Sequence, residues 1–182
     1  MLTALALTAL TLSAQQPEYT PQYTKDGQLI RPENYREWIY LSSGLGMTYG
    51  LVESAANFAT GERFDNVFVA PQAYKVFQQT GTWPDKTVFV MEVRTASTKG
   101  SINKGGHYQE DVVTTEVHVK DESRFASKWE FFVYGKERTA KPMGPNSRCQ
   151  SCHSENGAVD NTFVQFYPTL IPTAKAKGTF KH

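Results

Sequence analysis

Residues 87–95, with the sequence TVFVMEVRT, decide the fold class. They combine β-branched and aromatic side chains, which is typical of a β-strand. Residues 112–119 (VVTTEVHV) and 129–134 (WEFFVY) predict two more strands of the same kind. A Gly/Ser/Lys-rich loop at 99–106 and a turn at 121–127 separate the three, so the pattern favours an antiparallel sheet.

The segments upstream predict short helices and one more strand. A short β-type run at 66–69 is followed by a predicted helix at 71–79, with Pro71 near its start and Gly81 after its end. Residues 32–40 are expected to open another short helix, residues 42–50 to form a loop, and residues 175–182 to fray. The predicted fold class is α+β, mainly antiparallel β-sheet with a few short helices.

Length and charge limit the domain organisation and the partners. The chain has 182 residues, which suits one domain with a real core. Its formal net charge is +1, with no basic run, so neither a nucleic acid nor an anionic membrane is expected as a partner.

Residues 1–14 differ from the rest because they are apolar and small and carry no charge. A bilayer span needs about 20 residues, so no membrane span is expected, and the segment is interpreted as a secretory signal peptide ending at Ala14. No Lys or Arg precedes the apolar run, so a first helix of the domain is the alternative. The interpretation predicts a single domain over 15–182 and a periplasmic or secreted protein.

Cys149, Cys152 and His153 form the sequence CQSCH, which matches the attachment motif of c-type haem. Two thiols two residues apart can add to the two vinyl groups on one edge of a porphyrin, and the adjacent imidazole can then ligate the iron. The motif therefore predicts one haem c, covalent through Cys149 and Cys152, with His153 as the metal ligand and the haem packed against the sheet.

Three other interpretations of the cysteines stay open. A zinc site would need four ligands, and the remaining histidines show no paired spacing. A thioredoxin-like redox pair would need a βαβ context, and a non-haem extracellular binding module could carry a plain disulfide.

No residue can be identified from the sequence as a sixth iron ligand. Met47, Met91 and Met143 are the available thioethers, and Met91 lies within a predicted strand, where methionine is usually a core residue. His107 and His118 are likewise expected to be surface or core residues. An electron carrier would have a sixth protein ligand, whereas an open position permits ligand binding or catalysis.

At this point the sequence resembles the cytochrome P-460 family, which includes the cytochromes c′-β. The resemblance spans roughly residues 34–170 and rests on an ordered series of segments rather than on one motif. The series comprises residues 34–38, 67–71 with Tyr74, 80–81, 87–92, 116–121 with Arg124 and Phe125, 129–131, 149–153, Asp160, Phe163, Phe166, Tyr167 and Pro168.

The resemblance implies a curved antiparallel sheet packed on haem, usually in a homodimer, with a five-coordinate iron held by His153. Some members oxidise hydroxylamine or nitric oxide, and others bind nitric oxide. The hydroxylamine-oxidising members carry a strand lysine bonded to the haem edge, and the matching position here is Met91, which cannot form that link. Glu116 matches a position near the distal pocket, where it could accept a proton from a bound substrate.

The leading hypothesis is thus a periplasmic mono-haem c-type cytochrome with an open distal site, which binds nitric oxide and oxidises hydroxylamine or nitric oxide. Phe89, Phe131 and Phe163 are the candidates for its apolar wall. A redox partner protein would exchange the electrons. The alternative is a six-coordinate electron-transfer cytochrome without substrate chemistry.

Overall fold

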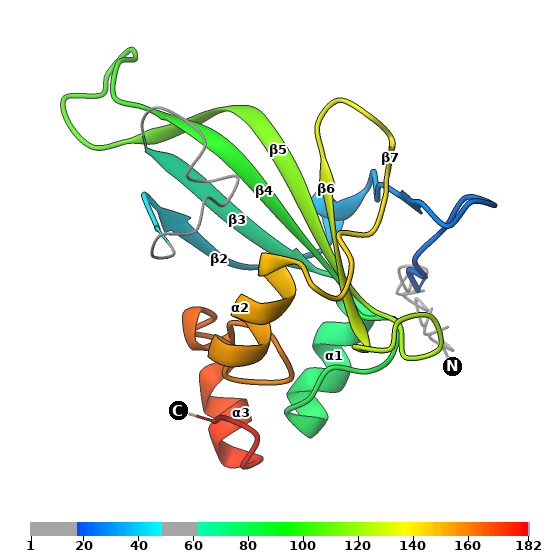
Figure 1. The fold of residues 1–182 in the computed structure, drawn as a ribbon. Helices are drawn as coiled ribbons and strands as arrows, with labels where there is room; N and C mark the ends of the chain where they lie inside the picture. Colours follow the sequence, from blue (N-terminus) through cyan, green and yellow to red (C-terminus); the bar gives the residue numbers. More distant parts are fainter. Residues whose placement is uncertain (1–17, 49–61, 182) are drawn as a thin grey trace, which may run out of the picture.

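The computed structural model describes residues 18–48 and 62–181, and its main feature is a five-stranded antiparallel sheet with the order β2-β3-β4-β5-β6 (Figure 1). The strands of this sheet are β2 (Ile39–Leu45), β3 (Arg63–Val69), β4 (Val88–Ser97), β5 (Tyr108–Lys120) and β6 (Trp129–Tyr134). A second, two-stranded sheet pairs β1 (Leu29–Ile30) with β7 (Thr139–Ala140). The predicted signal peptide, residues 1–14, lies outside the described residues.

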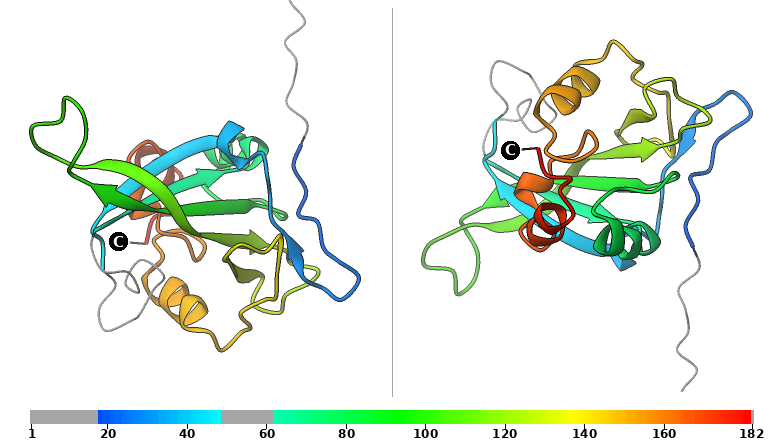
Figure 2. Two further views of the ribbon diagram at one scale, coloured as in Figure 1. Left: turned by 90° about the horizontal axis from the view of Figure 1, so that it is seen from above. Right: turned by 90° about the horizontal axis from the view of Figure 1, so that it is seen from below.

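Three α-helices lie together at one end of the large sheet, opposite the end from which the β4–β5 hairpin projects (Figures 1 and 2). They are α1 (Pro71–Thr80), α2 (Arg148–Asn156) and α3 (Ile171–Ala176), and two 3₁₀ turns, η1 (Tyr35–Glu37) and η2 (Val164–Phe166), complete the helical structure. Within residues 18–48 and 62–181, no helix has the length and apolar character needed to cross a bilayer.

The end of the large sheet nearest the helices is buried on both faces, which explains why β4 is apolar from Val88 to Val93 except at Glu92. Val88 and Val90 point into a core shared with β1 and η1, whereas Phe89 points into a core shared with the helices. Successive side chains of a strand face opposite sides, so this alternation assigns Phe89 and Met91 to the helical side. The predicted α+β class, its strands and helix α1 are confirmed.

The predicted loop at 42–50 is wrong over residues 42–45, which belong to β2. Ser42, Ser43 and Gly44 have weak β propensity, but they pair with β3 opposite Val67, Asn66 and Asp65. The hydroxyl of Ser43 also donates to Asn66 Oδ1 at 2.9 Å. Tertiary pairing therefore overrides the local composition.

The helix predicted at 32–40 is also wrong, because only the 3₁₀ turn η1 forms and Trp38 is already extended. Tyr35 donates from its hydroxyl to Glu92 Oε2 at 2.5 Å, and Arg36 binds the same oxygen at 2.6 Å. These bonds to β4 hold the segment against the sheet, so the chain leaves the helical conformation after one turn.

The C-terminal tail is not frayed within the described residues. The Thr179 hydroxyl donates to the carbonyl of Gly81 at 2.7 Å, and the amide of Lys181 donates to the carbonyl of Ala158 at 2.9 Å. Phe180 packs against the core on the helical side. Polarity and terminal position alone therefore misjudged a segment that contributes to the core.

Candidate functional site

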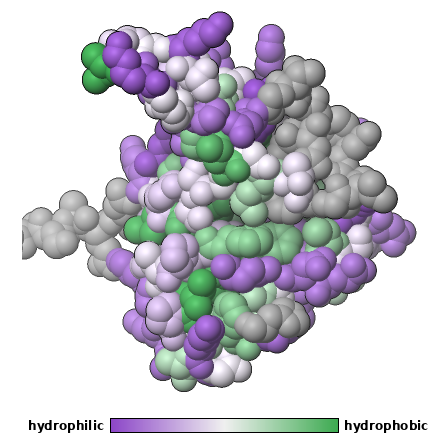
Figure 3. Space-filling view, turned by 90° about the vertical axis from the view of Figure 1, so that its left-hand side faces the viewer, coloured by the Kyte–Doolittle hydropathy of each residue, from purple (hydrophilic) through white to green (hydrophobic). Residues whose placement is uncertain are grey.

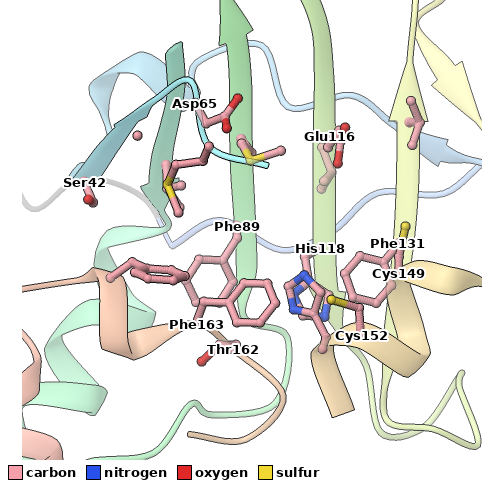
Figure 4. A pocket seen from close by; sticks show the side chains of 18 of the residues that line it. Ser42, Asp65, Phe89, Glu116, His118, Phe131, Cys149, Cys152, Thr162 and Phe163 are labelled. Atoms are coloured by element: carbon pink, nitrogen blue, oxygen red, sulfur yellow. The ribbon is translucent and has the colours of Figure 1, made fainter. Parts of the chain in front are cut away.

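A cavity of about 350 Å³ lies between the helical face of the large sheet and α2 (Figure 4). Its volume is within the range of small-molecule and cofactor sites. All of the site residues proposed from the sequence line it, namely Phe89, Met91, Glu116, Phe131, Cys149, Cys152, His153 and Phe163. The methionines considered as sixth ligands, Met47, Met91 and Met143, line it as well.

Strand register brings the sheet residues of the cavity together. Phe89 pairs with His118, and His118 pairs with Phe131, so these three side chains form one row across β4, β5 and β6. Met91 pairs with Glu116 in the next row along the same face. In Figure 4 the rings of Phe89, Phe131 and Phe163 lie with His118 at one end of the cavity, and the carboxylates of Asp65 and Glu116 lie at the other.

Helix α2 carries the thiols and the imidazole on one face. Cys152 and His153 follow Cys149 by three and four positions, a spacing that brings side chains together on a helix. The Ser147 side chain caps the helix by accepting from the Gln150 amide at 3.3 Å. The Met143 amide donates to the Phe131 carbonyl at 3.0 Å, which ties the segment before α2 to β6.

His153 is prepared as a neutral ligand. Its Nδ1 lies 2.9 Å from the backbone oxygen of Asn161, which can only accept, so the proton is on Nδ1 and Nε2 carries the lone pair. Burial lowers the pKa of His153 to about 4, which keeps the ring uncharged at neutral pH. A histidine that ligates a metal has this arrangement, with its other ring nitrogen donating to a carbonyl.

The two thiols are free, and neither is activated as a thiolate. Burial raises the pKa of Cys149, with a smaller contribution from Glu116, and burial also raises the pKa of Cys152. A thioredoxin-like cysteine would have a lowered pKa and a parallel βαβ setting, whereas both sheets of the described chain are antiparallel. Among the described residues, no three His, Cys, Asp or Glu side chains form a metal cluster that could hold zinc.

His118 lines the cavity and is buried, which agrees with its expected place as a surface or core residue. Its ring stacks on Phe131 at 4.0 Å between centroids, and its Nε2 has no hydrogen-bond partner in the described structure. The His118 and His153 rings are 4.8 Å apart at 70°, which leaves no room for a porphyrin plane between them. The two imidazole rings therefore contact each other directly. His107 lies outside the cavity and binds Glu62 at 2.7 Å.

Asp65 is a cavity residue that the sequence analysis did not identify. It is only 3% exposed, and neither carboxylate oxygen has a hydrogen-bond partner among the described residues. Burial raises the pKa of Asp65 to about 6, and burial together with Asp65 raises that of Glu116 to about 7. The alternation of β3 could have indicated it, because Asp65 lies two residues before Val67 on the same face.

The donor set fits haem c. Two free thiols and a neutral imidazole with its lone pair on Nε2 line an otherwise largely apolar cavity. The unpartnered polar atoms of His118 and Asp65 face the same space, which is the expected condition of groups that meet a bound cofactor or its ligand.

Comparison with protein-family models identifies a family for most of the chain. The family described as Cytochrome P460 matches residues 32–164, which is most of the chain and includes the cysteines, His153, Met91 and Glu116. No curated protein matches the chain.

Proposed function

Because the chain belongs to the Cytochrome P460 family of haem cytochromes, we propose that it carries one covalent haem c with an open sixth position, binds nitric oxide, and oxidises hydroxylamine or nitric oxide. The observation that carries the proposal is one cavity that combines a neutral His153 and two free thiols with an apolar wall, the unpaired carboxyl group of Asp65 and the side chain of Glu116.

Cys149 and Cys152 would hold the porphyrin through thioether bonds, and His153 Nε2 would ligate the iron. When bound, the haem supplies a redox-active iron with one position for a small ligand. Burial raises the pKa of both thiols and so favours their uncharged form.

The apolar wall supports small neutral ligands. Phe89 and Phe131 are buried, and Phe163 packs on His153 at 4.2 Å between ring centroids. Such a wall offers little hydrogen bonding to water or to anions, so it favours small uncharged molecules such as nitric oxide and hydroxylamine.

Glu116 supplies the proton chemistry. Oxidation of hydroxylamine removes protons as well as electrons, and a carboxylate at the edge of the cavity can accept one. Its pKa of about 7 is well matched to proton transfer near neutral pH. Met91 on β4 pairs with Glu116 on β5. The resemblance matches Met91 to the crosslinking lysine of the hydroxylamine-oxidising members, and a methionine would form no amine crosslink to the haem.

Optical spectra of the haem-loaded protein test this function. Produced in a host that matures c-type cytochromes, the protein should retain haem after denaturation, show a high-spin ferrous spectrum without a strongly red-shifted Soret band, and bind carbon monoxide and nitric oxide. The double variant Cys149→Ser/Cys152→Ser should lack covalent haem. Ferrous protein that takes up neither gas would contradict the proposal.

A six-coordinate electron carrier is the second candidate, and the thioethers of Met91 and Met143 in the cavity lining are what favour it. A low-spin reduced spectrum with sharp bands would support it. Conversion to high spin in Met91→Leu or Met143→Leu would then identify the ligand.

The periplasmic location, the signal peptide, the homodimer and the redox partner protein remain predictions. The intact mass of the exported protein would locate cleavage after Ala14 and count the haem. Sedimentation of the haem-loaded protein would give its oligomeric state.

The projecting β4–β5 hairpin is mainly hydrophilic, with a hydrophobic patch at its tip (Figure 3), and Ile102 in its loop is 89% exposed.

A further inference from the structure

We propose that Lys120 and Asp160 are positioning residues for the proximal histidine: their partly buried ion pair holds the turn 159–162 so that the Asn161 carbonyl binds His153 Nδ1, and this sets how strongly the imidazole donates to iron. The inference rests on the proposed role of His153 as the iron ligand.

The backbone of the turn 159–162 has an unfavourable conformation that its surroundings must stabilise. Val159 and Thr162 pair as an isolated antiparallel bridge, and the two residues between them, Asp160 and Asn161, have φ values of 46° and 58°. Aspartate and asparagine are among the side-chain-bearing residues that best tolerate this left-handed region, yet it still costs free energy. The conformation directs the Asn161 carbonyl toward His153 at 2.9 Å.

Lys120 binds this turn from the large sheet. It lies at the end of β5, two residues after His118, and is only 7% exposed. Its ammonium group donates to Asp160 Oδ2 at 2.7 Å and to the Trp83 carbonyl at 2.8 Å, with Glu122 at 3.5 Å. A lysine is seldom buried to this degree unless it is paired, and breaking such a pair leaves a buried charge.

Indole groups complete the attachment on either side of the ion pair. Trp129 donates from Nε1 to Asp160 Oδ1 at 3.3 Å, and Trp83 donates from Nε1 to the Thr162 hydroxyl at 2.8 Å. Thr162 in turn donates to the Val159 carbonyl at 2.6 Å. The turn is thus fastened to β5, β6 and the segment before β4, while its Asn161 carbonyl faces α2.

The chemical consequence follows from the hydrogen bond at Nδ1. An imidazole whose Nδ1–H is firmly engaged is a better electron donor through Nε2, and such partners tune a bound metal. A stronger donor stabilises ferric over ferrous iron and strengthens the iron–histidine bond. A turn released from Lys120 would hold the carbonyl less firmly, so both effects would weaken.

The test uses haem-loaded Lys120→Met, Asp160→Asn and the double variant. Asparagine keeps the size of Asp160 and tolerates its positive φ, and Lys120→Arg keeps the charge. Lys104→Met is the control, because Lys104 is exposed in the loop between β4 and β5, which projects from the end of the sheet opposite the helices. The readouts are the iron–histidine stretching frequency of the ferrous protein and the midpoint reduction potential.

Positioning and simple charge predict opposite patterns. If the pair positions the turn, both single variants lower the stretching frequency and shift the potential to more positive values, and the double variant adds little. If the residues act only through their charge, loss of the cation makes the potential more negative and loss of the anion makes it more positive. That sign reversal, or an unchanged stretching frequency in Asp160→Asn, would overturn the inference.

Failure of the proposed function would look different. A wild-type protein that is six-coordinate in the ferrous state would contradict the open site but leave the potentials of the variants as a valid test of the ion pair. If Lys120→Met does not accumulate, Lys120→Arg should preserve the wild-type frequency while Asp160→Asn lowers it.

Discussion

Glu116 gives the residue-scale prediction for activity. Its pKa is raised to about 7 by burial and by Asp65, and only its ionised form can accept a proton. The rate of hydroxylamine oxidation should therefore rise as the pH increases through about 7, and it should be low at more acidic pH. Glu116→Gln should reduce the rate by about 10²-fold or more and remove this step from the pH profile. Initial rates of haem-loaded protein across neutral pH measure both effects.

Asp65→Asn is the matched control for Glu116. It removes the neighbouring charge that raises the pKa of Glu116 but leaves the Glu116 carboxyl in place, so the step should move to lower pH without a large loss of rate. Any titration of hydroxylamine itself would persist in all variants. A Glu116→Gln protein with the full rate and the same step would rule out Glu116 as the proton acceptor.

Thr162 gives a residue-scale prediction for stability. Its hydroxyl accepts from Trp83 Nε1, and both side chains are almost fully buried. Thr162→Val keeps the shape but leaves the indole N–H without an acceptor, which should lower the free energy of unfolding by about 1–3 kcal/mol. Denaturant unfolding measures it. Thr162→Ser retains the hydroxyl and should lose less, whereas equal losses would show that the hydroxyl contributes nothing.

At the scale of elements, Gly81 ends α1 under two constraints. Its φ of +74° is left-handed, and a Cβ there would lie 2.7 Å from the Cβ of Lys177, next to α3. Gly81→Ala should therefore cost more than the backbone penalty of about 1–2 kcal/mol alone, because the α1–α3 contact must also shift. Gly27 has φ of +83° with open space around it, so Gly27→Ala isolates the backbone cost. Equal changes in unfolding midpoint for the two variants would refute the packing argument.

The elements that could be predicted are those with a strong local pattern. Strand β4 has its β-branched run, and α1 has proline at its start and glycine after its end, so their sequence and their environment agree. Strand β2 was missed because its serines and glycine form a strand only through pairing with β3. The single turn η1 was overestimated because its end is determined by bonds to Glu92, which is distant in sequence.

The site residues likewise divide into those with a local sequence pattern and those without one. Cys149, Cys152 and His153 lie within one five-residue motif and could be assigned from it alone. Asp65 reaches the cavity through the register of three strands, and the Asn161 carbonyl reaches His153 through a turn that no propensity rule announces. Contacts that depend on strand register or on one backbone conformation carry no local signature, so this part of the site could only come from the structure.

At the scale of the whole molecule, the C-terminal tail connects parts that are far apart in sequence. Thr179 binds the end of α1, Lys181 binds Ala158 just before the turn 159–162, and Phe180 packs on the core between them. Ending the chain at Gly178 removes both hydrogen bonds and the aromatic contact, so the free energy of unfolding should fall by about 2 kcal/mol. The variants Thr179→Val and Phe180→Ala separate the hydrogen bond from the packing, and each should lose part of that amount. Because Ala158 leads into the turn that holds Asn161, the truncation should also lower the iron–histidine stretching frequency, as Asp160→Asn does. An unchanged unfolding midpoint would mean that the tail frays in solution, as its composition alone predicts.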